Sequence, residues 1–217
     1  MSLFSFFTSE QSPLIRDAIR SVDTMLEVSG EMLDTALAHL LDNEPLAFDL
    51  SARDREVNEN EQRVRRLVLE HLAIDPGTER TMSLLLVSSV QEAERLGDLA
   101  KSLAQAASLA DKPRLSPHAE PLRDLRDRLL SLVQDAREGF IEDGATAARR
   151  VDDEHRAIKV VVADYLQTLA HADDVTSNEA VVYAISARMM GRVASHLSNI
   201  VSATLVPFDQ IRRSGQN

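Results

Sequence analysis

Two segments of the chain carry carboxylates at helical spacing, and binding of a hard metal cation is the chemistry they suggest. Asp54, Asn58 and Glu61 are separated by four and three residues, so they share one face of a helix. Glu94 and Asp98 are separated by four residues in a second segment. Carboxylates at this spacing repel each other, and a cation that prefers oxygen ligands, such as Mg²⁺, Mn²⁺ or an iron ion, would relieve the repulsion.

The same residues also fit an ion-paired helix surface without any metal. Arg95 or Lys101 could neutralise the second carboxylate pair, and Arg63 or Arg65 could neutralise the first group. Spacing alone does not distinguish these two interpretations, because structural ion pairs use the same residue types.

Two histidines have weaker patterns. His155 follows Asp152 by three residues, a spacing that can ligate one metal but is more typical of a helix-surface ion pair. The chain contains no Glu-x-x-His sequence, which dimetal sites of the ferritin-like kind require in pairs. His196 lies on an apolar helix face, where we expect a hydrogen-bonded interior histidine.

Composition excludes several other classes of protein. The chain has 217 residues, of which 44% are hydrophobic and 27% charged, so it can bury a core. It has no cysteine, which excludes disulfides, thiolate nucleophiles and Fe–S clusters. A net charge of −11 argues against nucleic-acid binding. No apolar stretch approaches the ~20 residues of a membrane span, and the N-terminus lacks the basic start of a secretory signal. We expect a cytoplasmic protein.

Prolines and apolar periodicity define the elements that must position these side chains. Ser12-Pro13 predicts a helix start, residues 75–78 predict a turn followed by a new helix cap, and residues 173–177 predict another cap. Apolar residues recur every three or four positions between these marks, as in Ile15, Ala18 and Val22. The sequence therefore predicts an all-α fold of six long helices in an elongated antiparallel bundle.

The chain also contains a weak internal duplication. A shift of 97 residues places residues 94–98 on residues 191–195, with an arginine at the second position of both. Internal periods of this kind indicate repeated structural units. We predict an N-terminal apolar segment over residues 1–12, three-helix repeats over 13–110 and 111–208, and a C-terminal tail over 209–217.

Three segments resemble the PhoU family of phosphate-transport regulators. Residues 90–100, Val-Gln-Glu-Ala-Glu-Arg-Leu-Gly-Asp-Leu-Ala, resemble the Glu-Arg-Ile-Gly-Asp-type helix that ends each three-helix repeat of that family. Residues 54–58 resemble the Asp-x-x-Ile-Asp segment of the preceding helix. Residues 187–200 resemble the second-repeat motif, but Gly191 and Ser195 replace both of its carboxylates. The resemblance extends over about residues 13 to 208.

The resemblance implies a site, partners and a mode of action. Glu94, Asp98 and Asp54 would bind divalent or iron-type metal ions in a multinuclear site, with Asn58 at a position usually held by Asp; a second cluster is not expected. The protein would be no enzyme, and would contact a phosphate transporter component or a membrane sensor kinase. We expect a homodimer, cytoplasmic or peripheral at the inner membrane. A ferritin-like dimetal carboxylate protein and a metal-free structural bundle remain as alternatives.

Charge is unevenly distributed between the repeats. Residues 1–60 carry twelve acidic and four basic side chains, whereas the last 45 residues carry four of each. The acidic surface is therefore expected in the first repeat, where the predicted metal ligands also lie.

Overall fold

The chain folds into six α-helices and one short 3₁₀ turn, in a computed structural model that describes residues 11–141 and 145–205. The helices are α1 (Pro13–Asp42), α2 (Leu50–Ile74), α3 (Arg80–Ala107), α4 (Glu120–Ile141), α5 (Ala145–Ala170) and α6 (Ser177–Leu205), and the 3₁₀ turn η2 spans Pro117–Ala119. These two stretches contain no strand. The expectation of an all-α fold with six long helices is confirmed. Nearly all of the predicted N-terminal segment and the whole predicted tail fall outside the described residues.

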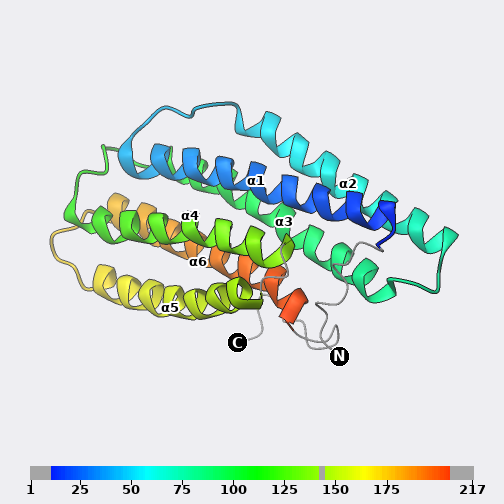
Figure 1. Cartoon of the computed structure of the whole chain (residues 1–217). Coiled ribbons are helices and arrows are strands. Elements are labelled where there is room, and N and C mark those ends of the chain that lie inside the picture. Colours follow the sequence, from blue (N-terminus) through cyan, green and yellow to red (C-terminus); the bar gives the residue numbers. More distant parts are fainter. Residues whose placement is uncertain (1–10, 142–144, 206–217) are drawn as a thin grey trace.

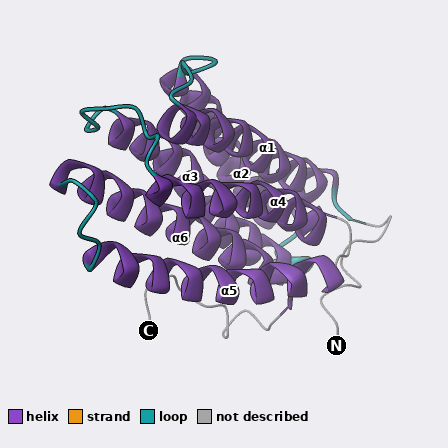
Figure 2. Cartoon of the chain, turned by 90° about the vertical axis from the view of Figure 1, so that its left-hand side faces the viewer, coloured by secondary structure: helices purple, strands orange, loops and turns teal. Residues whose placement is uncertain are grey.

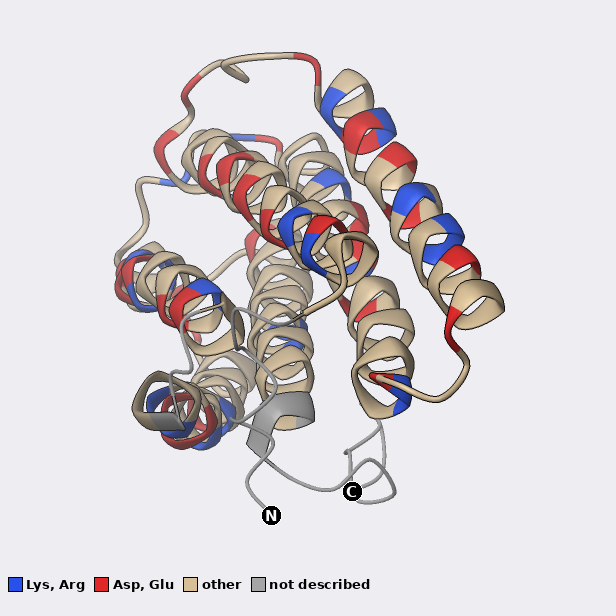
Figure 3. Ribbon diagram, turned by 45° about the vertical axis from the view of Figure 1, so that its right-hand side comes forward, with Lys and Arg blue, Asp and Glu red and all other residues tan. Residues whose placement is uncertain are grey.

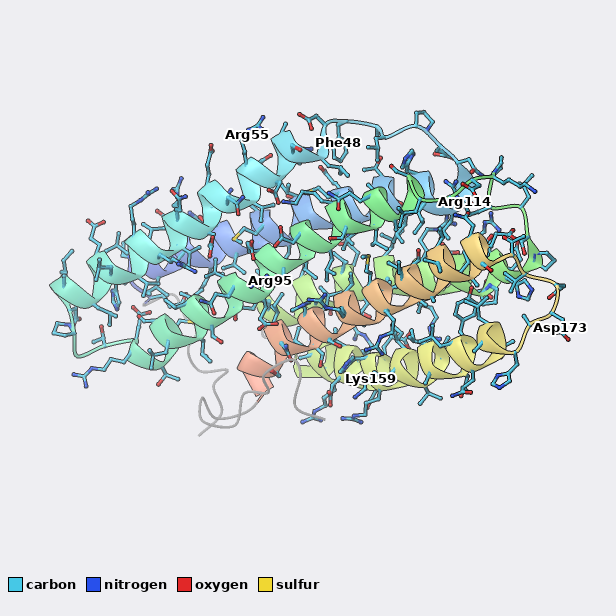
Figure 4. All side chains as sticks on the ribbon, turned by 180° about the vertical axis from the view of Figure 1, so that it is seen from behind. Phe48, Arg55, Arg95, Arg114, Lys159 and Asp173 are labelled. Atoms are coloured by element: carbon cyan, nitrogen blue, oxygen red, sulfur yellow. The ribbon has the colours of Figure 1, made fainter. Side chains whose placement is uncertain are left out.

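The six helices form an elongated bundle in which consecutive helices run antiparallel (Figure 1). The group α1, α2 and α3 is stacked on the group α4, α5 and α6 (Figure 2), and the groups meet where α3 packs on α6 and α1 packs on α4. On one side of the molecule α2, α3, α6 and α5 lie next to each other in this order (Figure 4). This four-helix face contains two antiparallel helix pairs, each from one repeat, and we call the lines along which their helices pack the α2/α3 and α5/α6 grooves.

Helix α1 shows how the apolar period creates the core. Its start is capped by the Ser12 hydroxyl, which accepts a hydrogen bond from the Leu14 amide at 3.3 Å, with Pro13 in the first turn. Its end is marked by Asn43, whose φ of 63° is left-handed. Because α1 contacts α2, α3 and α4, more than half of its residues are buried: Ile15, Ala18, Ile19, Ser21, Val22, Met25, Leu26, Val28, Ser29, Met32, Leu33, Thr35, Ala36, Leu37, Leu40 and Leu41.

The starts of α3 and α6 differ although the two helices begin 97 residues apart, at Arg80 and Ser177. Before α3, Asp75 forms the turn by accepting from the Gly77 amide at 3.1 Å, and the side chain of the N-cap residue Glu79 does not cap the helix but accepts from the Ser12 amide at 3.3 Å. Before α6, Thr176 and Glu179 exchange hydrogen bonds of 3.2 Å between each side chain and the other residue's amide. This reciprocal pair is a capping box.

The connection between the two groups of helices is fixed to the end of α1. Arg114 is buried, and its guanidinium donates to the carbonyl oxygens of Leu40 and, at 2.8 Å, of His39. Arg123 donates to the Leu41 carbonyl at 2.7 Å and pairs with Asp42 at 2.8 Å. These donors satisfy carbonyls that a helix end leaves without partners.

Acidic and basic residues are closely interleaved on α2. Figure 3 shows acidic and basic residues alternating along it, consistent with the sequence of residues 50–74. None of the described helices is both long and apolar enough to cross a membrane.

Candidate metal centre

A carboxylate from α2 and one from α3 meet at the ammonium group of Lys101, which also belongs to α3. Lys101 Nζ lies 2.7 Å from Asp54 Oδ2 and 3.0 Å from Asp98 Oδ1. The two carboxylate oxygens therefore cannot be farther apart than the sum of these distances. Asn58, one turn after Asp54, donates its amide to Asp54 Oδ2 at 3.3 Å. Three of the four predicted ligands, Asp54, Asn58 and Asp98, thus form one connected group. We call these three residues together with Glu61 and Glu94 the α2/α3 carboxylate groove.

Gly97 allows the α2 carboxylate to reach α3. A Cβ atom at this position would lie 3.3 Å from Asp54 Oδ1, which is tighter than ordinary van der Waals contact, and 3.8 Å from the Met32 methyl group below it. The glycine of the Glu-Arg-Leu-Gly-Asp sequence therefore has a packing role: it leaves room for a carboxylate from the neighbouring helix.

Glu94 is the carboxylate whose ionisation the groove opposes most clearly. Partial burial and the nearby charge of Asp98 raise the pKa of Glu94 above its ordinary value, with a smaller contribution from Glu61. Arg95 opposes this shift from 3.7 Å, but it also lies 3.8 Å from Asp98 and is exposed. The groove therefore carries more negative charge than its own cations neutralise.

For Lys101, in contrast, the groove favours the ionised form. Burial alone would lower the pKa of its ammonium group, but the hydrogen bonds and charges of Asp54 and Asp98 outweigh burial and raise it. The groove thus stabilises a positive charge at the point between Asp54 and Asp98. Glu61 at the rim is paired with Arg65 at 2.6 Å.

The donor set suits a hard cation, because carboxylate and amide oxygens are the ligands that such ions prefer. As described over residues 11–141 and 145–205, however, no three His, Asp or Glu side chains are arranged around a common point for a metal ion. The ion-paired interpretation is realised by Lys101 and Arg95. Metal ligation by Glu94, Asp98, Asp54 and Asn58 stays a prediction.

At the corresponding positions of α6 the second repeat has Gly191 and Ser195 in place of carboxylates. Ser195 donates its hydroxyl hydrogen to the Gly191 carbonyl at 3.0 Å and lies 3.2 Å from His155 Nε2. Asp152 and Asp153 both pair with Arg156 on their own helix, so neither is directed at Ser195.

Three hydrogen-bonded polar side chains connect the two repeats, and the sequence indicated only one of them, His196. His196 is buried, as expected, and its Nδ1 lies 2.8 Å from Glu92 Oε2 on α3; Asn199 donates to the same oxygen at 2.8 Å. Burial would raise the pKa of Glu92, but these two hydrogen bonds outweigh it and hold the pKa below its ordinary value. Glu92 was missed because its partners lie more than 100 residues away.

Comparison with known proteins identifies the class of the molecule. Residues 22–107 match the PhoU domain family, so the first repeat contains the matched region and the carboxylate groove lies within it. The resemblance seen in the sequence is thereby confirmed, and the chain is PhoU-like.

Individual relatives agree with this class. The chain is 24% identical over 210 residues to the phosphate-specific transport system accessory protein PhoU homolog 1 of Thermotoga maritima, covering 92% of this chain and 80% of that protein. The crystal structure of PhoU from Pseudomonas aeruginosa is similar with a TM-score of 0.81 and 19% identity, over 88% of this chain and 95% of that one. The phosphate transport system regulatory protein PhoU from Streptococcus pneumoniae gives a TM-score of 0.81 at 17% identity, over 92% and 97%. At these identities the solved structures establish the fold.

Proposed function

We propose that this chain is a non-enzymatic regulator of phosphate uptake and phosphate signalling that acts by protein contact. The match of residues 22–107 to the PhoU domain supports this function most directly, and the name of the Thermotoga relative points in the same direction. The partners would be a phosphate transporter component, a membrane sensor kinase, or both. The protein would work as a homodimer on the cytoplasmic side of the membrane.

The α2/α3 carboxylate groove would contribute by binding divalent or iron-type metal ions. Asp54, Glu94 and Asp98 would supply anionic oxygens and Asn58 a neutral one, while Lys101 would turn away from the position between Asp54 and Asp98. The bound ion would supply positive charge that relieves the repulsion between Glu94 and Asp98. The raised pKa of Glu94 supports this proposal, because it reports unrelieved negative charge in the groove.

The rival function, a ferritin-like dimetal enzyme, is less well supported by the geometry. Such enzymes gather carboxylates and histidines from four helices inside the bundle. Here Asp54 and Asp98 come from two neighbouring helices and keep 14% and 41% of their side-chain surface exposed. The groove is therefore an open surface feature.

Deletion of the gene in the producing organism tests the regulatory function. We expect a phosphate-starvation promoter to become active in phosphate-rich medium, and a plasmid copy of the chain to silence it again. Direct contact is then measured by binding of the purified chain to the purified ATP-binding component of the phosphate transporter and to the soluble part of the sensor kinase. An unchanged promoter together with no binding to either partner would contradict the proposal.

A further inference from the structure

Lys101 lies where a cation shared by the two helices of the α2/α3 carboxylate groove would have to lie. Its Nζ atom is 2.7 Å from Asp54 Oδ2 on α2 and 3.0 Å from Asp98 Oδ1 on α3. Asn58 donates to the same Asp54 oxygen at 3.3 Å. A metal ion that bridged Asp54 and Asp98 would have to displace the ammonium group, because two cations at such short distances from the same carboxylates repel each other strongly.

Exchange of the ammonium group for a divalent ion would improve the local charge balance. Asp54 and Asp98 carry two negative charges, and the ammonium group between them neutralises one. Arg95 lies 3.8 Å from Asp98, but it also lies 3.7 Å from Glu94 and is exposed, so it adds little. Lys101 is therefore a weaker counter-ion than the one these carboxylates can accommodate.

The residue type at position 101 is suited to such an exchange. Only three of the 24 basic residues are lysines. Over residues 11–141 and 145–205, every other ion pair that joins an Asp or Glu to a Lys or Arg of a different helix uses an arginine: Arg53, Arg123, Arg126, Arg128, Arg137 or Arg150. A guanidinium group holds a carboxylate through a rigid fork, whereas an ammonium group is a point charge on a flexible stem and is released more easily.

Lys101 can leave the carboxylates without disturbing the helix packing. Its side chain keeps 29% of its surface exposed, and the side chain of Asp98, three residues earlier on α3, keeps 41%. Rotation about the side-chain bonds of Lys101 is therefore enough to move the ammonium group into water.

We propose that Lys101 is a built-in counter-ion that competes with divalent metal ions for Asp54 and Asp98, and thereby sets the metal concentration at which the groove is occupied. This inference rests on the proposed metal binding by the groove. The ammonium group would relieve the repulsion between the carboxylates when no ion is bound, and would move into water when one binds. A lysine with a purely structural role has the opposite consequence, because its loss would loosen the groove and weaken metal binding.

Titration of the full chain with Mn²⁺, in which the EPR signal of the free ion is measured, tests the competition. Lys101→Gln should raise the Mn²⁺ affinity by about tenfold or more, since binding no longer breaks two charge-assisted hydrogen bonds. Lys101→Arg should lower the affinity by about threefold or more, since the rigid fork is harder to displace.

Two further variants separate competition from general electrostatic attraction. Arg95→Gln also removes a positive charge beside the groove, but from a solvated position 3.7 Å and 3.8 Å from Glu94 and Asp98. It should raise the affinity less than about threefold, because exposed ion pairs contribute little. Lys159→Gln makes the same change in net charge at an exposed position on α5 and should change the affinity less than about twofold.

NMR of the lysine ammonium groups gives a second readout. During titration of the wild type with Mg²⁺, the Nζ signal of Lys101 should move towards that of a solvated lysine, while the signals of Lys112 and Lys159 stay unchanged. In chelator, Lys101→Gln should lower the melting temperature, because it leaves two carboxylates without their shared donor. Saturating Mg²⁺ should then raise the melting temperature of this variant more than that of the wild type.

The outcomes separate this inference from the proposed metal binding. Tighter Mn²⁺ binding by Lys101→Gln together with weaker binding by Lys101→Arg supports the competition, and so does binding that is measurable only in Lys101→Gln. Binding by the wild type that is unchanged or weaker in Lys101→Gln overturns the competition and leaves the metal site in place. If neither protein binds Mn²⁺, the metal site and the competition are both wrong.

Discussion

The α2/α3 and α5/α6 grooves both lie between antiparallel helices of one repeat, but they differ in chemistry. In the first repeat Asp54 and Asp98 enclose a lysine ammonium group at 2.7 and 3.0 Å. In the second, Ser195 stands at the position of Asp98 and contacts His155 from α5. Two similarly arranged helix pairs can therefore differ in whether they hold a charged group, because a few side chains between the helices decide it.

The largest expected effect is on metal content, and it separates the two grooves. Glu94→Ala combined with Asp98→Ala should lower the metal bound per chain by at least about tenfold, because affinity of an oxygen site depends on the number of charged ligands. His155→Ala in the other groove should change it little. Metal analysis by mass spectrometry on untagged protein measures both variants. Equal losses from the two would show that the grooves do not differ in this respect.

A change at the junction of the repeats should affect stability without affecting the comparison between grooves. Glu92→Ala leaves the buried polar groups of His196 and Asn199 without their acceptor, and should lower the free energy of unfolding by about 1–3 kcal/mol. Urea unfolding measures the loss, and metal content should stay at the wild-type level.

The pH dependence of that loss has a definite sign. Since the pKa of Glu92 is depressed in the folded chain, its stabilisation is fully present above the ordinary glutamate pKa and is lost as the pH falls through the depressed value. The difference in unfolding free energy between wild type and Glu92→Ala should therefore shrink in acid. A difference that grows as the pH falls would contradict the assigned hydrogen bonds.

Restoring the carboxylates of the second motif should make the two grooves more alike. Gly191→Glu with Ser195→Asp is expected to fold, because a Cβ on Gly191 would meet Val162 at an ordinary 3.5 Å. The variant should bind additional metal, more weakly than the first groove because the α5 side chain that faces position 195 is His155 and not a carboxylate. Unchanged metal binding would show that the backbone plans differ more than the helices suggest.

The smallest effect concerns Glu94 in chelator-treated protein. Glu94→Gln should raise the free energy of unfolding at neutral pH by about 0.2–0.5 kcal/mol, since it removes one of two repelling charges. The pKa of Glu94 is raised in the folded chain, so the penalty on its ionised form is absent below the ordinary glutamate pKa and appears as the pH rises through the raised value. The gain measured by urea unfolding should accordingly vanish in acid. A gain that persists there would indicate a packing effect.

Much of the fold could be predicted because local signals coincide with it. Ser12-Pro13 caps α1, and residues 173–177 lead into the Thr176–Glu179 capping box of α6. The start of α3 is less regular: the N-cap Glu79 has a left-handed φ of 49° and makes no side-chain capping bond, and Asp75 uses its carboxylate within the turn instead. Local propensity specifies a turn there and leaves its geometry to packing.

The candidate site was predicted in its residues but not in its connections. Helical spacing grouped Glu94 with Asp98, and Asp54 with Asn58, because neighbours on a helix face follow from the period alone. Spacing could not show that Lys101 lies between Asp54 and Asp98, or that Gly97 admits Asp54. Contacts between helices depend on packing register, which the period of one helix does not contain.

The buried Arg114 helps to hold the two grooves in a fixed position relative to each other. This residue lies in the connection between the repeats and donates hydrogen bonds to carbonyls at the end of α1, so the connection is fixed to the first repeat. A partner that touched both grooves would meet them at a fixed spacing, and its second contact would form at a high effective concentration. Weak affinities at each groove could then combine into selective recognition of partners whose own charges match that spacing.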